Sequence, residues 1–113
     1  MKSYSYQVVR TEQADADITA ITDYIAYKFK APLTALKKAH LIQDAINHLH
    51  EHPFWQHQFY DNPWQGLNLY LYHVDRYTIV HLPDADAQTT TVLRILHDLQ
   101  DLSVQLSRTG VKP

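Results

Sequence analysis

The stretch NLYLYHVDRYTIVHLPDADAQTTTVLRILH, residues 68–97, decides the fold because it predicts three successive strands. Residues 68–74 and 77–82 alternate in side-chain character, and Asp75-Arg76 between them predicts a two-residue hairpin turn. After a turn at Pro83-Asp84-Ala85-Asp86, residues 89–97 are apolar enough to form a buried central strand. The stretch therefore predicts a mainly antiparallel sheet.

The expected register of the hairpin sorts its side chains into two faces. The facing pairs would be His73 with Thr78, Leu71 with Val80, and Leu69 with Leu82. One face carries Leu69, Leu71, His73, Thr78, Val80 and Leu82, and the other carries Tyr70, Tyr72, Val74, Tyr77, Ile79 and His81. We expect the first face to pack against the core. The second face, rich in Tyr and His, is expected to be the working face.

Upstream of residue 68 the sequence predicts a strand and two helices. Residues 4–10 are typical of a short strand, and Thr11 is suited to cap a helix over residues 12–29. An apolar stripe at helical spacing marks this helix: Ala14, Ile18, Ile21, Ile25 and Phe29. Ala31-Pro32 starts a second helix that ends near His52, and its stripe is Ala35, Ala39, Ile42, Ile46 and Leu49. The order βααβββ predicts an α+β fold, with a helical hairpin packed on one face of the sheet.

The remaining segments are predicted to be irregular. Residues 54–66 contain turn residues and five aromatic side chains, which we expect to lie over the sheet or the helices: Phe54, Trp55, Phe59, Tyr60 and Trp64. Residues 98–106 could add a short helical turn, and residues 108–113 are expected to be a loose tail. No repeat or linker interrupts the chain, so we expect one domain over residues 1–113.

Composition narrows the classes of function. The chain has 113 residues, no Cys and a formal net charge of −2 with His neutral. Without Cys there can be no disulfide and no thiolate site. The first residues carry no apolar leader, and no stretch is long enough to cross a bilayer, so a soluble cytoplasmic protein without a membrane partner is expected. A nucleic-acid site would have to be a local patch, because the net charge is not positive.

Four strings resemble the RelE/ParE toxin superfamily of bacterial toxin–antitoxin systems. They are DITAITDYIAYKFKAPLTA (17–35), YDNPWQGL (60–67), VDRYTIVHLPD (74–84) and VLRILHDLQDL (92–102). The resemblance implies the RelE/ParE-like fold and a cognate antitoxin as partner. It also implies one of two activities, since RelE-like toxins cut messenger RNA on the ribosome and ParE-like toxins block DNA gyrase. An oligomer is possible.

The chain departs from these relatives at three places where basic residues are common. It has Tyr70-Leu71 on the first hairpin strand, Thr78 after the hairpin tyrosine, and Asp98-Leu99-Gln100 after the last strand. Three interpretations remain open: a messenger-RNA endoribonuclease, a gyrase inhibitor without catalysis, and a detoxified homologue that binds only its antitoxin. The missing basic residues favour the second and third. The first is preferred because RNA cleavage is the more widespread activity of the superfamily.

Metal-independent RNA cleavage needs a base, an acid and a cation at the phosphate. The catalytic candidates are His97, His81, His73 and Tyr77, and the RNA-binding candidates are Arg94, Arg76, Tyr70 and Tyr72. Each also has a purely structural interpretation. His97 could be a hydrogen-bonded residue at a strand end, Arg94 could form an ion pair, and the three tyrosines could form a cross-strand aromatic cluster.

No metal or other cofactor is expected. His48 and His52 stand four residues apart on a helix and could share an ion, but no third ligand has a suitable spacing. We therefore expect these two residues to be solvated.

Overall fold

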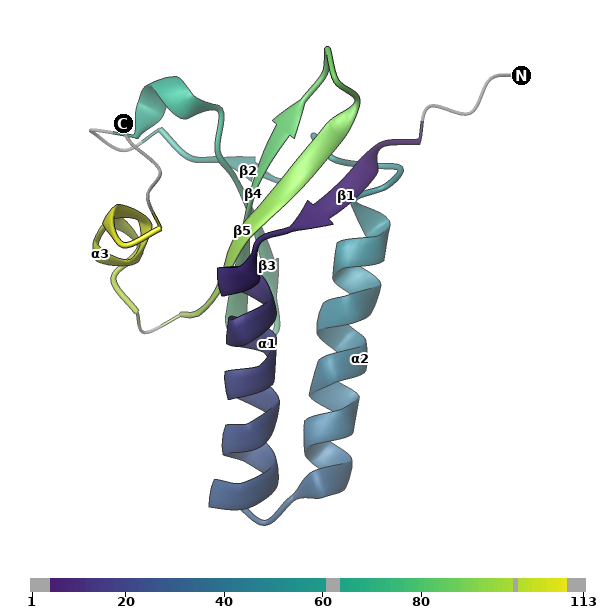
Figure 1. The fold of residues 1–113 in the computed structure, drawn as a ribbon, viewed down its shortest axis with the longest axis vertical. Helices are drawn as coiled ribbons and strands as arrows, with labels where there is room; N and C mark the ends of the chain where they lie inside the picture. Colours follow the sequence, from purple (N-terminus) through teal and green to yellow (C-terminus); the bar gives the residue numbers. More distant parts are fainter. Residues whose placement is uncertain (1–4, 61–63, 99, 110–113) are drawn as a thin grey trace.

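The computed structural model describes residues 5–60, 64–98 and 100–109 (Figure 1). Its elements, in chain order, are β1 (Gln7–Arg10), α1 (Glu12–Asp23), the π-helical segment η1 (Tyr24–Lys28), α2 (Pro32–His48), β2 (His57–Gln58), the 3-10 turn η2 (Gln65–Leu67), β3 (Tyr70–Val74), β4 (Tyr77–Asp84), β5 (Thr89–His97) and α3 (Leu102–Ser107). The expected α+β fold is confirmed. The turn residues 62–63 and most of the expected tail lie outside the described residues.

The five strands form one sheet in the order β1-β5-β4-β3-β2. Strand β1 runs parallel to β5, and every other neighbouring pair is antiparallel. The predicted hairpin is confirmed, because Val74 pairs with Tyr77 across the turn and His73 pairs with Thr78. The pair Leu69–Leu82 is absent because β3 begins one residue later, at Tyr70. Residues 68–97 therefore form three neighbouring strands, as the sequence predicts.

Helices α1 and α2 lie side by side and cover one face of the sheet (Figure 1). Thr11 caps α1, since its side chain accepts a hydrogen bond from the backbone N–H of Ala14 at 3.0 Å. The same hydroxyl donates to the carbonyl oxygen of Leu93 in β5 at 2.8 Å, which fixes the start of the helix to the sheet. Within the described residues, no helix has both the length and the apolar character that a bilayer span requires.

The helices pack on the face of the sheet that was expected to be the working face, so that assignment is wrong. The core beneath the helices consists of Ala14, Ile42, Ala45, Ile46, Leu49, Val74, Tyr77, Ile79, Val92 and Ile95, with Tyr72 packed against it. The opposite face has its own core: Phe59, Trp64, Leu69, Leu71, Val80, Leu93, Leu96 and Leu106. Helix α3 covers that second face together with Phe59, Trp64 and Leu67. Because the sheet is a middle layer with both faces covered, the apolar side chains of one face did not mean that the other face is exposed.

The first helix loses its regular winding at its C-terminal end. Residues 24–28 are wound as a π-helix, in which each hydrogen bond spans one residue more than in an α-helix. This change turns Phe29 away from the stripe to which the sequence assigned it, and its side chain is 63% exposed. Lys30 then takes a positive φ of 51°, which reverses the chain into α2. The expected stripe holds for Ala14, Ile18 and Ile21 and fails at Phe29.

The aromatic segment after α2 is only partly buried. Phe59 and Trp64 are in the second core, and the indole N–H of Trp64 donates to Ser103 of α3 at 3.0 Å. Phe54, Trp55 and Tyr60 are 43%, 72% and 65% exposed. The expectation that all five rings would be covered is therefore wrong for these three, because the short strand β2 places this segment at the edge of the sheet.

Candidate functional site

An open cavity of about 330 Å³ lies where the β3–β4 hairpin meets the end of β5. Its lining residues are Leu71, His73, Thr78, Leu96, His97, Asp98, Gln100 and Leu102. Two of these come from the predicted catalytic set and one, Thr78, is the cross-strand partner of His73. This cavity lies on the face of the sheet that α3 shares, away from the helical hairpin.

A chain of hydrogen bonds links three of the lining side chains. The hydroxyl of Thr78 donates to Oδ1 of Asp98 at 3.3 Å, and Nδ1 of His73 lies 3.0 Å from the same hydroxyl. Because a hydroxyl has one proton to donate, Nδ1 of His73 must be the donor in the second bond. Nε2 of the neutral imidazole then carries a lone pair. His73 is exposed, so this nitrogen could accept a proton from a bound group.

His97 lies with Tyr77 at the edge of the other face. Their rings meet edge to face with centroids 5.6 Å apart, beside an apolar hollow formed with Ala20, Ile21 and Tyr24. Burial raises the pKa of the Tyr77 hydroxyl above its usual value, so that the phenol stays protonated at neutral pH. The backbone N–H of His97 donates to the side chain of Gln100 at 2.8 Å. His97 therefore borders both this hollow and the cavity that His73 lines.

His81 is fully buried, which corrects its expected position on an exposed face. Its Nδ1 lies 2.8 Å from the hydroxyl of Thr90 and its Nε2 lies 3.1 Å from Oε1 of Gln56. The amide nitrogen of Gln56 donates to the carbonyl oxygen of His52, so its Oε1 is left to accept from Nε2. Burial lowers the pKa of His81 to about 4, and the ring is neutral at physiological pH.

Tyr70 and Tyr72 point to the helical side of the sheet. The ring of Tyr70 contacts Phe54 edge to face and lies 5.8 Å from the ring of His81. The ring of Tyr72 lies 5.9 Å from that of His48 on α2. The ring contacts of Tyr70 and Tyr72 thus join the sheet to α2 and to Phe54, and among the described residues they do not form the expected cluster of three tyrosines.

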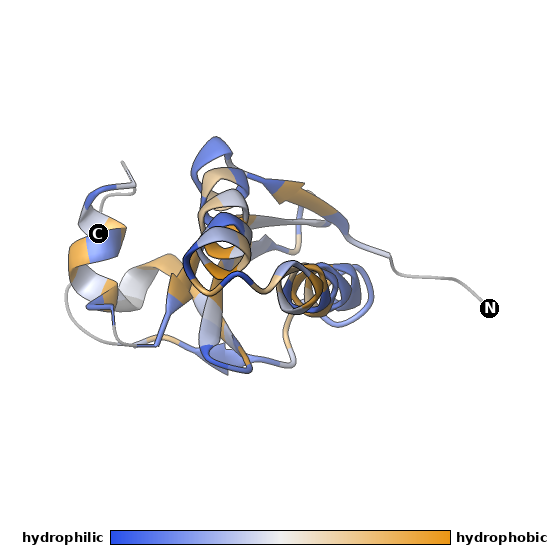
Figure 2. Ribbon diagram, turned by 90° about the horizontal axis from the view of Figure 1, so that it is seen from below, coloured by the Kyte–Doolittle hydropathy of each residue, from blue (hydrophilic) through white to orange (hydrophobic). Residues whose placement is uncertain are grey.

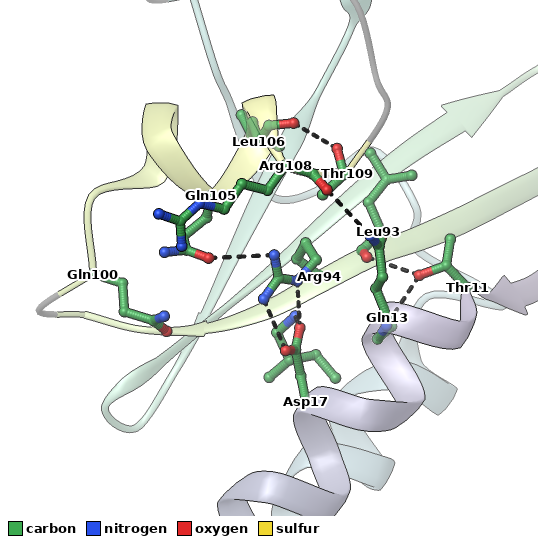
Figure 3. A network of polar contacts seen from close by, with 12 residues as sticks. Thr11, Gln13, Asp17, Leu93, Arg94, Gln100, Gln105, Leu106, Arg108 and Thr109 are labelled. Atoms are coloured by element: carbon green, nitrogen blue, oxygen red, sulfur yellow. Dashed lines mark hydrogen bonds and ion pairs between the residues drawn. The ribbon is translucent and has the colours of Figure 1, made fainter.

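Arg94 forms the ion pair that its structural interpretation predicted (Figure 3). Its Nε donates to one carboxylate oxygen of Asp17 at 2.7 Å and its Nη2 to the other at 2.9 Å. The same carboxylate accepts the backbone N–H of Ile95 at 2.9 Å, and Nη1 of Arg94 reaches Gln105 of α3 at 3.4 Å. The hydrogen bonds with Asp17 raise the pKa of Arg94 further. The guanidinium therefore connects α1, β5 and α3, whereas Arg76 is exposed in the hairpin turn.

Residues that sequence reasoning did not assign to a site complete the arrangement. The pairing of His73 with Thr78 was expected, but Thr78 was assigned no role, and Asp98 and Gln100 were noted only as replacements for basic residues. Asp17 was not assigned to a site. His48 and His52 have ring centroids 4.8 Å apart, and Trp55 stacks on His52 at 3.5 Å. Among the described residues no three His, Asp or Glu side chains gather as metal ligands would.

Comparison with known proteins identifies the family. A family model described as the ParE toxin of the type II toxin–antitoxin system parDE matches residues 8–102. The chain belongs to the ParE toxin family. No curated protein matches it in sequence.

Solved structures with the same fold as this ParE family member include two from toxin–antitoxin systems. One is the chromosomal ParDE system from P. aeruginosa, with 19% identity, a TM-score of 0.65, and coverage of 84% of this chain and 98% of that one. The other is the RelBE2 toxin–antitoxin complex from Mycobacterium tuberculosis, with 19% identity, a TM-score of 0.61, and coverage of 85% and 94%. The expected RelE/ParE relationship is confirmed, and the protein is a ParE-like toxin of a type II toxin–antitoxin system.

Proposed function

We propose that this ParE family member arrests growth by binding DNA gyrase, and that it has no catalytic activity of its own. The family match over residues 8–102 supports this target. The observation that carries the absence of catalysis is the lining of the cavity shared by His73 and His97, which includes the carboxylate of Asp98 but, among the described residues, no Arg or Lys. His81, the third candidate imidazole, is buried.

Cleavage of RNA requires these groups to converge. A base and an acid must lie within hydrogen-bond reach of the reacting oxygens, with a cation placed at the phosphate. Arg94 is engaged by both oxygens of Asp17, and its side chain is only 13% exposed. Arg76 lies in the adjacent hairpin turn, where its carbonyl oxygen accepts a hydrogen bond from the backbone N–H of Asp98 at 2.9 Å, and it is not among the residues that line the cavity. A protein that acts by binding needs none of this convergence.

Cleavage of messenger RNA on the ribosome is the second candidate function. It is favoured by the hydrogen-bonded chain from Asp98 through Thr78 to His73, which orients an exposed imidazole at the mouth of an open cavity. In that mechanism Nε2 of His73 would be the base. His97 lines the same cavity and would be the acid.

One pair of assays on the full chain separates these functions. We expect the wild-type protein to inhibit supercoiling by purified DNA gyrase and to leave translated messenger RNA intact in primer extension. Because no imidazole is catalytic in this proposal, His73→Ala and His97→Ala should inhibit gyrase within twofold of the wild type. His40→Ala, an exposed histidine on α2, is the matched control.

The opposite results select the other interpretations. Message cleaved by the wild type but not by His73→Ala would replace gyrase inhibition with the ribonuclease function. A chain that inhibits neither process and does not slow growth when expressed would be a detoxified homologue that binds its antitoxin.

We also propose a cognate antitoxin as a partner. The family and the two toxin–antitoxin structures support it, and the exposed rings of Trp55 and Tyr60 offer apolar anchors at the sheet edge. Co-expression with the product of the adjacent gene should give a complex that co-purifies at a fixed ratio. Trp55→Ser should shorten the lifetime of that complex in surface plasmon resonance, since loss of a buried anchor mainly raises the dissociation rate. An unchanged lifetime would remove this segment from the interface.

A further inference from the structure

The end of the helical hairpin combines exposed apolar side chains with positively charged side chains. Five large apolar residues there are more than half exposed: Tyr24 (55%), Tyr27 (78%), Phe29 (63%), Leu33 (75%) and Leu36 (53%). Monomeric proteins rarely leave so many large apolar side chains together in water without a use for them. We call this surface, residues 24–37 at the junction of η1 and α2, the hairpin tip.

The charge of the hairpin tip contrasts with that of the whole chain. Between Asp23 and Asp44 there is no acidic residue, and this interval holds Lys28, Lys30, Lys37 and Lys38. The chain as a whole has a net charge of −2. In the described part of the chain, Lys38 pairs with Asp75 of the β3–β4 turn, and no salt bridge occupies the other three lysines. The tip is therefore a local positive surface on a slightly negative protein.

The backbone at the tip is irregular in a way that displays these side chains. The π-helical winding of residues 24–28 turns Phe29 outward, where its ring meets that of Tyr24 edge to face at 5.3 Å. Lys30 holds a φ of 51°, a conformation in which glycine is far more stable than lysine. A lysine at this position sacrifices stability and supplies a charge. Both irregularities are typical of segments that serve binding.

Figure 1 shows where the hairpin tip lies in the fold. The two helices extend past the end of the sheet, and their junction lies beyond the strands at the lower end of the view. Figure 2 looks onto this junction from below. The tip can therefore enter a groove of a partner without a collision of the sheet or of α3 with that partner.

We propose that the hairpin tip is the surface that docks on the target protein, at an apolar groove bordered by carboxylates. This inference rests on the proposed function. An apolar centre with a charged rim is the usual anatomy of a protein interface, and the lysines require acidic residues opposite them. Nucleic acid fits less well, because Leu33 and Leu36 cannot stack on bases as aromatic rings do.

The test measures binding of the full chain to purified DNA gyrase. Tyr27→Ser with Phe29→Ser should weaken binding at least tenfold, because exposed rings of this kind become interface anchors. Lys28→Glu with Lys37→Glu should weaken it as much and should reverse its sensitivity to salt. Val104→Ser on α3 and Arg108→Glu directly after α3 are the matched apolar and charge controls, and both should bind within twofold of the wild type.

Lys30→Gly separates binding from folding. Glycine relieves the positive φ, so this variant should melt at a higher temperature than the wild type and still bind gyrase more weakly. Loss of binding in a more stable protein cannot result from unfolding. Equal binding by the wild type and by both double variants would overturn the docking surface.

Failure of the proposed function gives a different result. If the wild-type chain does not bind gyrase but does arrest growth, the wild type and the tip variants are compared by growth arrest instead. Loss of arrest in the tip variants, with antitoxin binding intact, would then support docking on another acidic target. Growth arrest by the tip variants equal to that of the wild type would overturn the proposal. So would loss of antitoxin binding in the tip variants, or tight binding of the tip to DNA or to phosphatidylglycerol vesicles.

Discussion

Asp17→Ala is expected to lower the free energy of unfolding by about 3 kcal/mol, the range seen when one partner of a buried ion pair is removed. The substitution leaves the guanidinium of Arg94 largely buried without its carboxylate, since the two side chains are 13% and 16% exposed. It also leaves the backbone N–H of Ile95 without its acceptor. Urea unfolding of the purified protein, followed by circular dichroism, measures the change.

The same helix supplies the control. Asp15 pairs with Arg10 at 3.0 Å, but these side chains are 54% and 39% exposed, so Asp15→Ala should cost less than about 1 kcal/mol. The double variant Asp17→Ala with Arg94→Leu should recover part of the loss, because no charge is then buried alone. Equal costs for Asp15→Ala and Asp17→Ala would show that burial does not strengthen the inner pair.

His81 is expected to make the protein sensitive to acid. Burial lowers its pKa to about 4 in the folded protein, whereas the unfolded chain takes up a proton near pH 6.5. The stability that this residue provides is complete above about pH 6.5, falls as the pH drops from 6.5 to 4, and is constant below. The difference between the two pKa values corresponds to about 3 kcal/mol. Urea unfolding at a series of pH values measures this loss.

The variant His81→Gln isolates this contribution from the other histidines. Its amide can donate and accept, as the ring does with Gln56 and Thr90, but it does not titrate. We expect the loss of stability between pH 6.5 and 4 to be smaller in this variant by about 3 kcal/mol. His57→Gln, at an exposed histidine, should retain the wild-type loss. Parallel pH profiles for the wild type and His81→Gln would contradict the assignment.

The fold could be predicted from the sequence because its elements obey local rules. The Asp75-Arg76 turn set the register of the hairpin, and the apolar spacing up to Ile21 placed α1 against the sheet. Phe29 could not be placed in this way, because the change to π-helical winding alters the period on which the prediction depends. Which face of the sheet is exposed also could not be predicted, since a helix of six residues, α3, helps to cover the second face.

The candidate site could be predicted from the sequence less well than the fold. The sequence named histidines by their chemistry, but only contacts between distant residues decide whether a histidine is buried. Gln56 reaches His81 from 25 positions away, and Asp17 reaches Arg94 from 77 positions away. The neighbour of His73 was predictable, because cross-strand pairing follows from the register of a single turn.

Strand β1 ends opposite Val92, and within the described residues the last five positions of β5 continue without a strand on that side. Three side chains take the place of the missing strand. Thr11 donates to the carbonyl oxygen of Leu93, Asp17 accepts from the N–H of Ile95, and Gln100 accepts from the N–H of His97. An extended peptide from another chain would have to break these bonds before it could add to the sheet here. This border of the molecule is thereby protected from amyloid-like association and from strand exchange between copies.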